Sequence, residues 1–292
     1  MRLVLEGYTG GVSIGGRRLT NLRYADDIIL IAGSASELQE LVARMQSAST
    51  EMGLRINVKT TVMSLNTDEK PEVSIYGERV QTVDSFKYLG VIFTEEASGT
   101  MEFQARLNLG YAKLATLKPM LQRKDVPATL KARLIQAIVF PVVTYGCEAW
   151  SLTKDERSKL RAFETKSYRR ALGIRYTDRV TNEEVFARTG CEAMLETQVR
   201  RRKLRYFGHV VRHESLEQDI MLGMVPGTKR QGGQKRQWID DICNWATMSG
   251  SVTPLPNGRT PKALSKTVSL ARDREVWRCA VHDFANPAHR VG

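Results

Sequence analysis

The sequence has few cysteines and no long apolar run. Its four cysteines are far apart and fit no disulfide framework, which favours a reducing compartment over a secretory one. No stretch approaches the roughly 18 unbroken apolar residues of a transmembrane helix. The first residues also lack the apolar segment and cleavage site of a signal peptide. We therefore expect an intracellular protein, in the nucleus or the cytoplasm, that is neither secreted nor embedded in a membrane.

Acidic residues are scarce relative to basic ones. The 292 residues include 44 Lys and Arg against 32 Asp and Glu, for a net charge of +12 and a pI near 9.7. This balance favours a polyanionic partner, nucleic acid first and an anionic membrane second. The alternative is a basic protein with no such partner. Composition alone indicates how a protein associates, and it does not establish a function.

The hydrophobic period changes near residue 98. Before it, residues 12–32 have the pattern of short consecutive strands, with Gly15-Gly16 suited to a tight hairpin turn. Residues 36–52 have a helical period that includes Leu38, Leu41, Val42, Met45 and Met52, and Gly53 can close the helix. Further strands are expected at 54–58, 61–65, 73–77 and 86–93. This part of the chain predicts a mixed α+β fold.

After about residue 100 the pattern is helical. Pro127 can open a helix over 127–140 with Leu130, Leu134, Ile135 and Ile138 as its buried stripe. Thr153 and Glu156 form a capping-box pattern for a helix through Leu172, and Thr181 and Glu184 repeat the signal. Residues 249–267 are rich in Ser, Thr, Pro and Gly and are expected to be a linker. The four tryptophans are expected to anchor helix packing.

Two adjacent carboxylates stand in the apolar run LRYADDIILIAG, residues 22–33. Neighbouring strand residues point to opposite faces, so Asp26 and Asp27 could share one ligand best at a hairpin turn. A divalent cation would offset the repulsion between them, and Mg²⁺ is commonly held by one or two carboxylates together with substrate phosphates. The alternative is an acidic turn exposed to water, which an Asp-Asp pair alone favours.

Several motifs in order resemble those of reverse transcriptases. Residues 24–27, YADD, resemble the YADD box of these enzymes, and residues 53–60 and 86–90 resemble the segments that follow it. Farther on, the chain resembles the C-terminal part of non-LTR (LINE-type) retrotransposon polymerases, with the RTE-like endonuclease–reverse transcriptases as the nearest group. The segments that carry this second resemblance are residues 145–150, 204–212, 230–242 and 273–281.

The resemblance implies three regions and one reaction. Residues 1–98 would be the C-terminal part of the polymerase palm, with antiparallel β-hairpins and a helix. Residues 99–175 would be a helical, thumb-like region, and residues 176–292 a basic helical C-terminal region. The implied activity is RNA-directed DNA synthesis from an RNA template, a DNA primer and deoxynucleotides. Its cofactor would be Mg²⁺, with Mn²⁺ as the other ion that could serve.

The same resemblance implies roles for individual residues. Asp26 would be a catalytic metal ligand with Asp27 as its partner, and Tyr24 and Lys59 would contact substrate. The Lys-Thr pair is one residue closer to Asn57 than the family pattern, so Lys59 could equally be a surface lysine. The primer-grip residues, which hold the primer end, would be Phe86, Tyr88, Leu89 and Gly90, although aromatic residues in this strand could also be core.

Parts of the family pattern are not found in the sequence. The family uses a further Asp on an upstream strand and a Gln-Gly helix at the nucleotide pocket, whereas Glu6 is the sole acidic residue before Asp26. Two metal ions need carboxylates from separate strands. We therefore expect a truncated fragment, with Met1 as an internal start, that is inactive unless a separate chain completes the palm. The alternatives are a non-catalytic nucleic-acid-binding remnant and the translation of a decayed transposon that never folds.

Two basic clusters without acidic residues are candidate phosphate-binding segments. Residues 200–213 would form a helix with a phosphate-facing stripe and an apolar side of Leu204, Phe207 and Val211. Residues 227–238 are rich in Gly and Gln. A solvated charge run is the usual alternative, and phosphate contacts carry no base specificity. The candidate residues are Arg200, Arg201, Arg202, Lys203, Arg205, Lys229, Arg230, Lys235 and Arg236.

A zinc site is disfavoured. Cys191, His209, His213 and Cys243 are the residues that could form one, but the sequence contains no pair of cysteines separated by two residues. The oligomeric state and the template or target specificity do not follow from the sequence.

Overall fold

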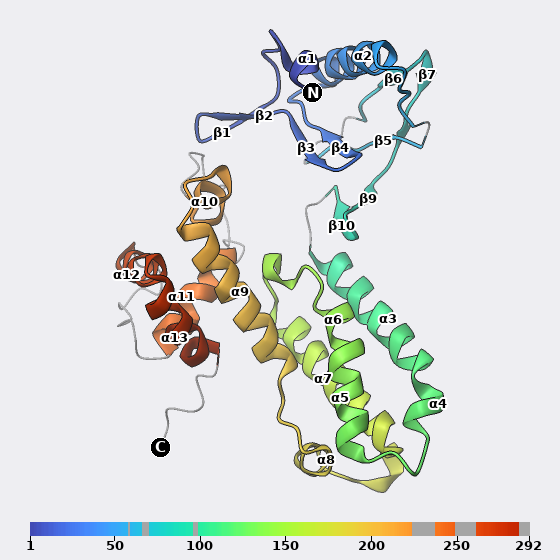
Figure 1. The fold of residues 1–292 in the computed structure, drawn as a ribbon, viewed down its shortest axis with the longest axis vertical. Coiled ribbons are helices and arrows are strands. Elements are labelled where there is room, and N and C mark those ends of the chain that lie inside the picture. The colour runs from blue at the N-terminus through green and yellow to red at the C-terminus, as the bar shows by residue number, and fades with distance from the viewer. Residues whose placement is uncertain (58, 66–69, 96–98, 224–236, 249–260, 286–292) are drawn as a thin grey trace. The chain divides into compact units, whose positions relative to one another are not determined.

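All the described strands lie before residue 95, and helices predominate after it. The computed structural model describes residues 1–57, 59–65, 70–95, 99–223, 237–248 and 261–285 (Figure 1). Its contacts divide the described chain into a first unit, which ends before Gly99, and a second unit, which begins there. The mixed α+β fold class is therefore confirmed. Within the described residues no helix is long and apolar enough to cross a membrane.

Within its described residues, the first unit consists of two helices and five two-stranded sheets. Four sheets are antiparallel hairpins, β1–β2, β3–β4, β6–β7 and β9–β10, and β5 pairs with β8 in parallel. The elements are α1 (Arg2–Leu5), β1 (Val12–Ile14), β2 (Arg17–Leu19), β3 (Asn21–Tyr24), β4 (Asp27–Leu30), α2 (Ala35–Glu51), β5 (Thr61–Val62), β6 (Ser74–Ile75), β7 (Glu78–Arg79), β8 (Gln81–Thr82), β9 (Ser85–Tyr88) and β10 (Val91–Thr94).

Two predicted features of the first unit are confirmed, and two are wrong. Gly15 and Gly16 have φ of 56° and 78° at the β1–β2 turn, and Gly53, at 70°, follows the end of α2. Both turns need the left-handed backbone that glycine adopts at little cost. Leu54–Asn57 form no strand, and Met52 is 61% exposed rather than part of the buried stripe. In the 61–65 segment the strand spans only Thr61–Val62, and Val62 is its buried residue.

Glu37 joins three segments of the first unit through one carboxylate oxygen. Its Oε2 accepts hydrogen bonds from the amide of Gly11, at 3.1 Å, and from the amide of Gly33, at 3.0 Å. The Ser34 hydroxyl accepts from the Glu37 amide at 3.2 Å and so caps α2. The residues before β1 and after β4 are thereby fixed to the start of α2. The two backbone amides lower the pKa of Glu37, because they favour the charged carboxylate.

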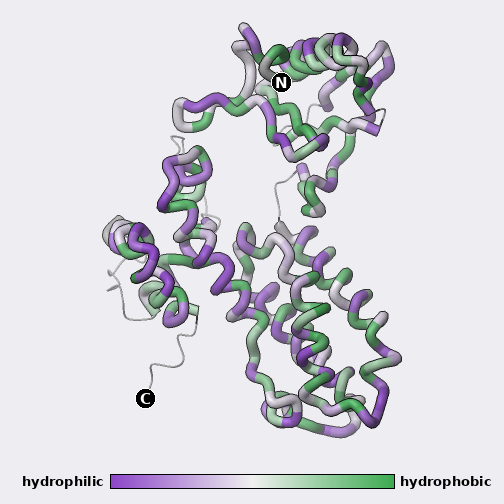
Figure 2. Tube along the Cα trace, viewed as in Figure 1, coloured by the Kyte–Doolittle hydropathy of each residue, from purple (hydrophilic) through white to green (hydrophobic). Residues whose placement is uncertain are grey.

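The second unit is helical and contains two core clusters. Its helices are α3 (Thr100–Thr116), α4 (Lys118–Leu121), α5 (Ala128–Ile138), α6 (Phe140–Val143), η1 (Cys147–Ala149), α7 (Lys154–Leu172), η2 (Tyr176–Asp178), α8 (Asn182–Thr189), α9 (Leu195–Val211), α10 (Leu216–Met221), α11 (Trp238–Met248), α12 (Pro261–Arg272) and α13 (Arg274–Ala285). Hydrophobic and hydrophilic positions alternate along these helices, as a 3.6-residue period predicts (Figure 2).

The predicted helix boundaries agree better with the structure than the predicted buried positions. The capping box of Thr153 and Glu156 opens α7, and Gly173 with φ of 68° closes it. In α5, Leu130 is 44% exposed, and the fully buried residues are Ala132 and Ile135. Residues 261–267 belong to α12 rather than to a linker, and the remainder of that predicted linker, 249–260, lies outside the described residues.

One helix, α9, contributes to both core clusters. Leu195 and Val199 pack in the cluster made with α3, α5 and α7, whereas Leu204, Phe207 and Val211 pack in the cluster made with α11 and α13. Trp277 donates from Nε1 to the carbonyl of Leu204 at 2.9 Å, and Trp238 to that of Glu148 at 2.7 Å. The tryptophans thus anchor helix packing as predicted.

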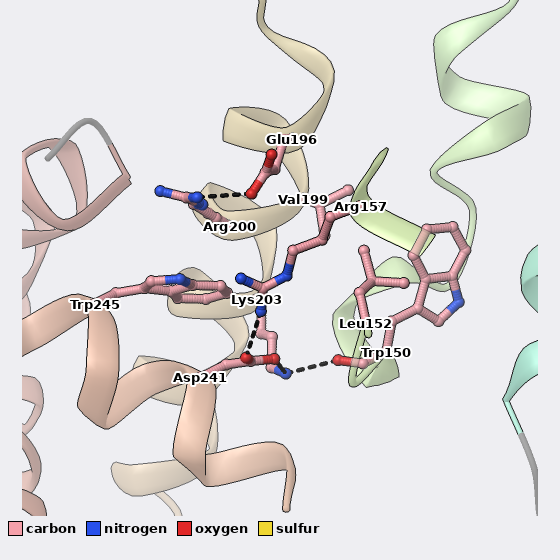
Figure 3. Close-up of a pocket in the computed structure, with 9 residues that line it drawn as sticks. All are labelled: Trp150, Leu152, Arg157, Glu196, Val199, Arg200, Lys203, Asp241 and Trp245. Atoms are coloured by element: carbon pink, nitrogen blue, oxygen red, sulfur yellow. Dashed lines mark hydrogen bonds and ion pairs between the residues drawn. The ribbon is translucent and has the colours of Figure 1, made fainter. Parts of the chain in front are cut away.

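A buried ion network lies between the two clusters. The Lys203 ammonium of α9 donates to Asp241 Oδ2 of α11 and to the carbonyl of Trp150, each at 2.6 Å. Arg157 of α7 donates to Asp241 Oδ1 at 2.9 Å. The side chains of Lys203 and Asp241 are 1% and 3% exposed. Figure 3 shows the pocket that Arg157, Lys203 and Asp241 line. The other lining residues are Trp150, Leu152, Glu196, Val199, Arg200 and Trp245.

Breaking the buried pair from one side should strongly destabilise the second unit. Asp241→Leu leaves the Lys203 charge buried without its carboxylate, and loss of one partner of a buried pair costs about 3–5 kcal/mol. We expect urea unfolding followed by tryptophan fluorescence to show this loss. The double variant Lys203→Met/Asp241→Leu should recover most of it, because apolar residues of similar volume replace both charges. Lys166→Met, at an exposed position, is the control. An Asp241→Leu variant as stable as this control would contradict the prediction.

The Glu37 carboxylate should stabilise the first unit in a pH-dependent way. A lowered pKa means that the contribution is present above the ordinary value of 4.5 and is lost as the pH falls through the folded-state value. Compared with Glu37→Gln, the wild-type chain should therefore be more stable at pH 7, and the difference should shrink below pH 4.5. Glu40→Gln is the control for removal of a carboxylate elsewhere on α2. Unfolding curves for the three proteins across this range test the prediction, which fails if the difference does not depend on pH.

Candidate functional site

Asp26 and Asp27 lie at the tip of the β3–β4 hairpin, as the sequence predicts. Tyr24 and Asp27 are the last pair of the ladder, so Ala25 and Asp26 make a two-residue turn. Ala25 has φ of 52°, the left-handed conformation that such short turns require of their first central residue. Asp26 is therefore presented by the turn, and Asp27 by the first position of β4.

Both carboxylates are exposed to solvent. Water can therefore hydrate these charges, and in the described structure they do not need a cation to offset burial. Their hard oxygen donors have the chemistry that Mg²⁺ prefers. However, the described residues contain no group of three or more His, Cys, Asp or Glu side chains that could hold a metal ion. Asp26 and Asp27 fit part of a carboxylate site for Mg²⁺ but do not complete a two-ion site.

One face of the β3–β4 hairpin exposes apolar side chains beside Asp27. The register places Leu22 and Tyr24 on the same face as Asp27, because alternate residues of a strand share a face. Leu22 is 43% exposed and Tyr24 64% exposed. On the other face, Leu30 packs with Val42 and Leu41 of α2. The carboxylates thus stand on a hairpin that is packed from one side within the described chain.

Lys59 is exposed near the start of β5. Its amide donates to Asn57 Oδ1 at 2.9 Å, which forms a local turn. No interaction among the described residues joins its side chain to Asp26 or Asp27. The structure therefore brings the two aspartates and Tyr24 together but gives Lys59 no contact with them.

The proposed primer-grip residues form the β9–β10 hairpin. Phe86 pairs with Phe93 across the strands, and their rings stack with centroids 5.4 Å apart. Tyr88 is the last residue of β9, and Leu89 and Gly90 form the turn with φ of 49° and 83°. The expected β-structure at 86–93 is present, but as two strands joined by the Leu89-Gly90 turn rather than as one strand. Phe86 and Tyr88 are half-buried, whereas Leu89 at the tip is exposed.

The basic run of α9 is engaged largely inside the protein. Lys203 is buried in the ion pair with Asp241, so its predicted place in a phosphate-facing stripe is wrong. Arg200 pairs with Glu196 at 2.6 Å, and Arg202 pairs with Glu148 at 2.6 Å and donates to the carbonyl of Thr144 at 2.8 Å. The predicted apolar side of the helix, Leu204, Phe207 and Val211, is confirmed as buried.

The acidic partners explain why the sequence was misleading here. Residues 200–213 lack acidic residues, but Glu148, Glu196 and Asp241 lie outside that window and the fold brings them to it. Arg201 is half-buried and Arg205 is exposed, and these two remain candidates for phosphate contact. Lys229, Arg230, Lys235 and Arg236 lie outside the described residues.

The residues of the disfavoured zinc site are distributed between different clusters. Cys191 packs against the first core cluster and Cys243 against the second. His209 and His213 are neighbours, with ring centroids 4.6 Å apart. Burial raises the pKa of the Cys243 thiol to about 11, which disfavours the thiolate that would ligate zinc.

Comparison with known proteins relates the chain to reverse transcriptases. Residues 5–93 match the family model of the reverse transcriptase (RNA-dependent DNA polymerase). The chain is also 29% identical over 281 residues to an uncharacterized transposon-derived protein of Caenorhabditis elegans, in a match that covers 92% of this chain and 97% of that protein. No solved structure matches the chain. Together with the YADD turn, these matches make residues 5–93 similar to reverse transcriptases and most of the chain similar to a transposon-derived protein.

Proposed function

We propose that this chain is part of an RNA-directed DNA polymerase from a non-LTR, RTE-like retrotransposon. The observation that carries the proposal is the β3–β4 turn, which presents Asp26 and Asp27 together within the segment that matches reverse transcriptases. Residues 1–98 would be the C-terminal part of the palm, residues 99–175 the thumb-like region and residues 176–292 the basic C-terminal region.

In the parent reaction, a primer 3′-hydroxyl attacks the α-phosphate of a deoxynucleotide and pyrophosphate leaves. Divalent ions, Mg²⁺ first, supply the charge that stabilises the attacking and leaving oxygens. Asp26 would be a ligand and Asp27 its partner, both at the tip of the hairpin. Tyr24, on the same face, and Lys59 would contact the nucleotide, and Phe86, Tyr88, Leu89 and Gly90 would position the primer end on the second hairpin.

The described chain supplies too few ligands for this reaction. A two-ion site needs carboxylates held by more than one strand, and only Asp26 and Asp27 stand together here. The exposed Leu22 and Tyr24 beside Asp27 are consistent with a palm surface that another segment would cover. We therefore propose that residues 1–292 by themselves are inactive unless further carboxylates complete the palm.

A second candidate function is non-catalytic binding of nucleic acid. The net charge of +12 favours it, because a basic surface binds phosphates without any metal site. The paired buried charges of the second unit favour a folded product over the translation of a decayed element, since random changes would leave such charges without partners.

Primer extension on an RNA template with Mg²⁺ tests the proposal. We expect no extension by the wild-type chain or by Asp26→Asn/Asp27→Asn, while both bind a template–primer duplex equally in a mobility-shift assay. The reason is that the aspartates alone do not complete the metal site. Wild-type extension that disappears in the double variant would contradict the inactivity and would require a further carboxylate. A chain that binds no nucleic acid even at low salt would contradict both candidate functions.

A further inference from the structure

The charge that the helix α7 (Lys154–Leu172) exposes to solvent is not evident from its sequence. It contains seven basic residues and three acidic residues, interleaved so that no acid-free run stands out. The basic residues are Lys154, Arg157, Lys159, Arg161, Lys166, Arg169 and Arg170, and the acidic residues are Asp155, Glu156 and Glu164.

Two of the three acids point into the protein. Glu156 is 7% exposed and closes the capping box, where its Oε2 accepts from the Thr153 amide at 2.8 Å. Glu164 is 1% exposed and accepts from the amides of Met194, at 2.9 Å, and Leu195, at 3.2 Å, at the start of α9. Asp155 is therefore the one acidic residue of α7 that faces solvent.

Four cations of the same helix point outward. Lys154, Lys159, Lys166 and Arg170 are exposed, and none forms an ion pair with an acid of the described chain. Lys159, Lys166 and Arg170 are seven and four residues apart, so they fall within about 40° of one another around the helix axis, at 100° per residue. We name the outward face of Lys159, Lys166 and Arg170 the α7 basic face, whereas Lys154 lies about 140° from Lys159 around the axis and is not part of it.

One acid and one small residue lie among these cations. Asp155 and Ala162 are exposed, about 40° and 60° from Lys159 around the helix axis, whereas Leu160, Phe163 and Tyr168 are fully buried. The α7 basic face therefore combines three cations with one carboxylate. A surface with this excess of positive charge attracts a polyanion. It also lacks the exposed Trp, Phe or Leu side chains with which an interfacial helix enters a lipid surface.

We propose that the α7 basic face binds the phosphate backbone of nucleic acid without reading its sequence. The inference rests on the proposed function for the class of partner, but its position on α7 follows from the burial of Glu156 and Glu164 and the exposure of Lys159, Lys166 and Arg170. It also differs from the sequence-based expectation, because the basic run of α9 pairs largely with acids of the protein itself. Lys and Arg contacts to phosphate position a nucleic acid and make its binding depend on salt.

The test compares two full-length variants with equal loss of charge. The first, Lys159→Gln/Lys166→Gln/Arg170→Gln, neutralises three cations of the α7 basic face. The control, Lys266→Gln/Arg272→Gln/Arg274→Gln, neutralises three exposed cations on α12 and α13. Binding of an RNA–DNA hybrid duplex is measured by fluorescence anisotropy from 50 to 200 mM salt, and thermal unfolding checks that both variants remain folded.

We expect the α7 variant to bind at least tenfold more weakly and to lower the slope of log affinity against log salt by roughly 2–3, close to one for each phosphate contact. The control should change the slope by less than about one. Equal effects of the two variants, or an unchanged α7 variant, would overturn the inference while leaving the proposed function intact. A wild-type chain that binds no hybrid would instead contradict the proposed function itself.

Anionic lipid vesicles provide the second arm of the test. Vesicles of phosphatidylserine and phosphatidylcholine should compete weakly for the wild-type chain, since the α7 basic face exposes no large apolar side chain. If the α7 variant loses vesicle binding and retains hybrid binding, the face is a membrane surface and the inference is wrong.

Discussion

The pairing of Lys203 with Asp241 is the interaction on which the second unit most depends. Desolvating an ammonium and a carboxylate costs several kcal/mol each, and their attraction compensates this only with good geometry and further hydrogen bonds. The structure supplies both, through the 2.6 Å contact, the Trp150 carbonyl and Arg157. Because Lys203 lies on α9, which packs in both core clusters, the pair fixes α7, α9 and α11 to one another at the point where the clusters adjoin.

The fold pairs some charged residues of the second unit with one another and leaves others exposed to solvent. Arg200, Arg202 and Lys203 of α9 are held by Glu196, Glu148 and Asp241, so a run that is strongly basic in sequence is largely neutralised within the fold. On α7, backbone amides donate to Glu156 and Glu164, whereas Lys159, Lys166 and Arg170 remain exposed. The surface that can meet a polyanion is therefore set by where the acidic residues are buried.

Local features of the fold were predictable from the sequence. Two-residue turns need particular backbone angles, so the Gly15-Gly16 and YADD turns could be placed, and the Thr153–Glu156 capping box depends on four consecutive residues. The side of a helix that becomes buried depends on which helices pack against it, and Leu130 was misplaced for that reason. The partners of Lys203 and Arg202 lie 38 and 54 residues away, and no local pattern indicates them. The roles of Asp26 and Asp27 came from resemblance, whereas the absence of a third ligand beside them in the described chain came from the structure.

We expect α7, rather than the basic run of α9, to present the cations that meet nucleic acid. The most direct measurement is photo-crosslinking of the wild-type chain to a 4-thiouridine-labelled RNA–DNA hybrid, followed by mass spectrometry of the adducts. We expect adducts on peptides from residues 158–170 and none at Arg200, Arg202 or Lys203. Adducts concentrated at these three residues and absent from α7 would contradict this, because the side chains would then have to leave their acidic partners to reach a phosphate.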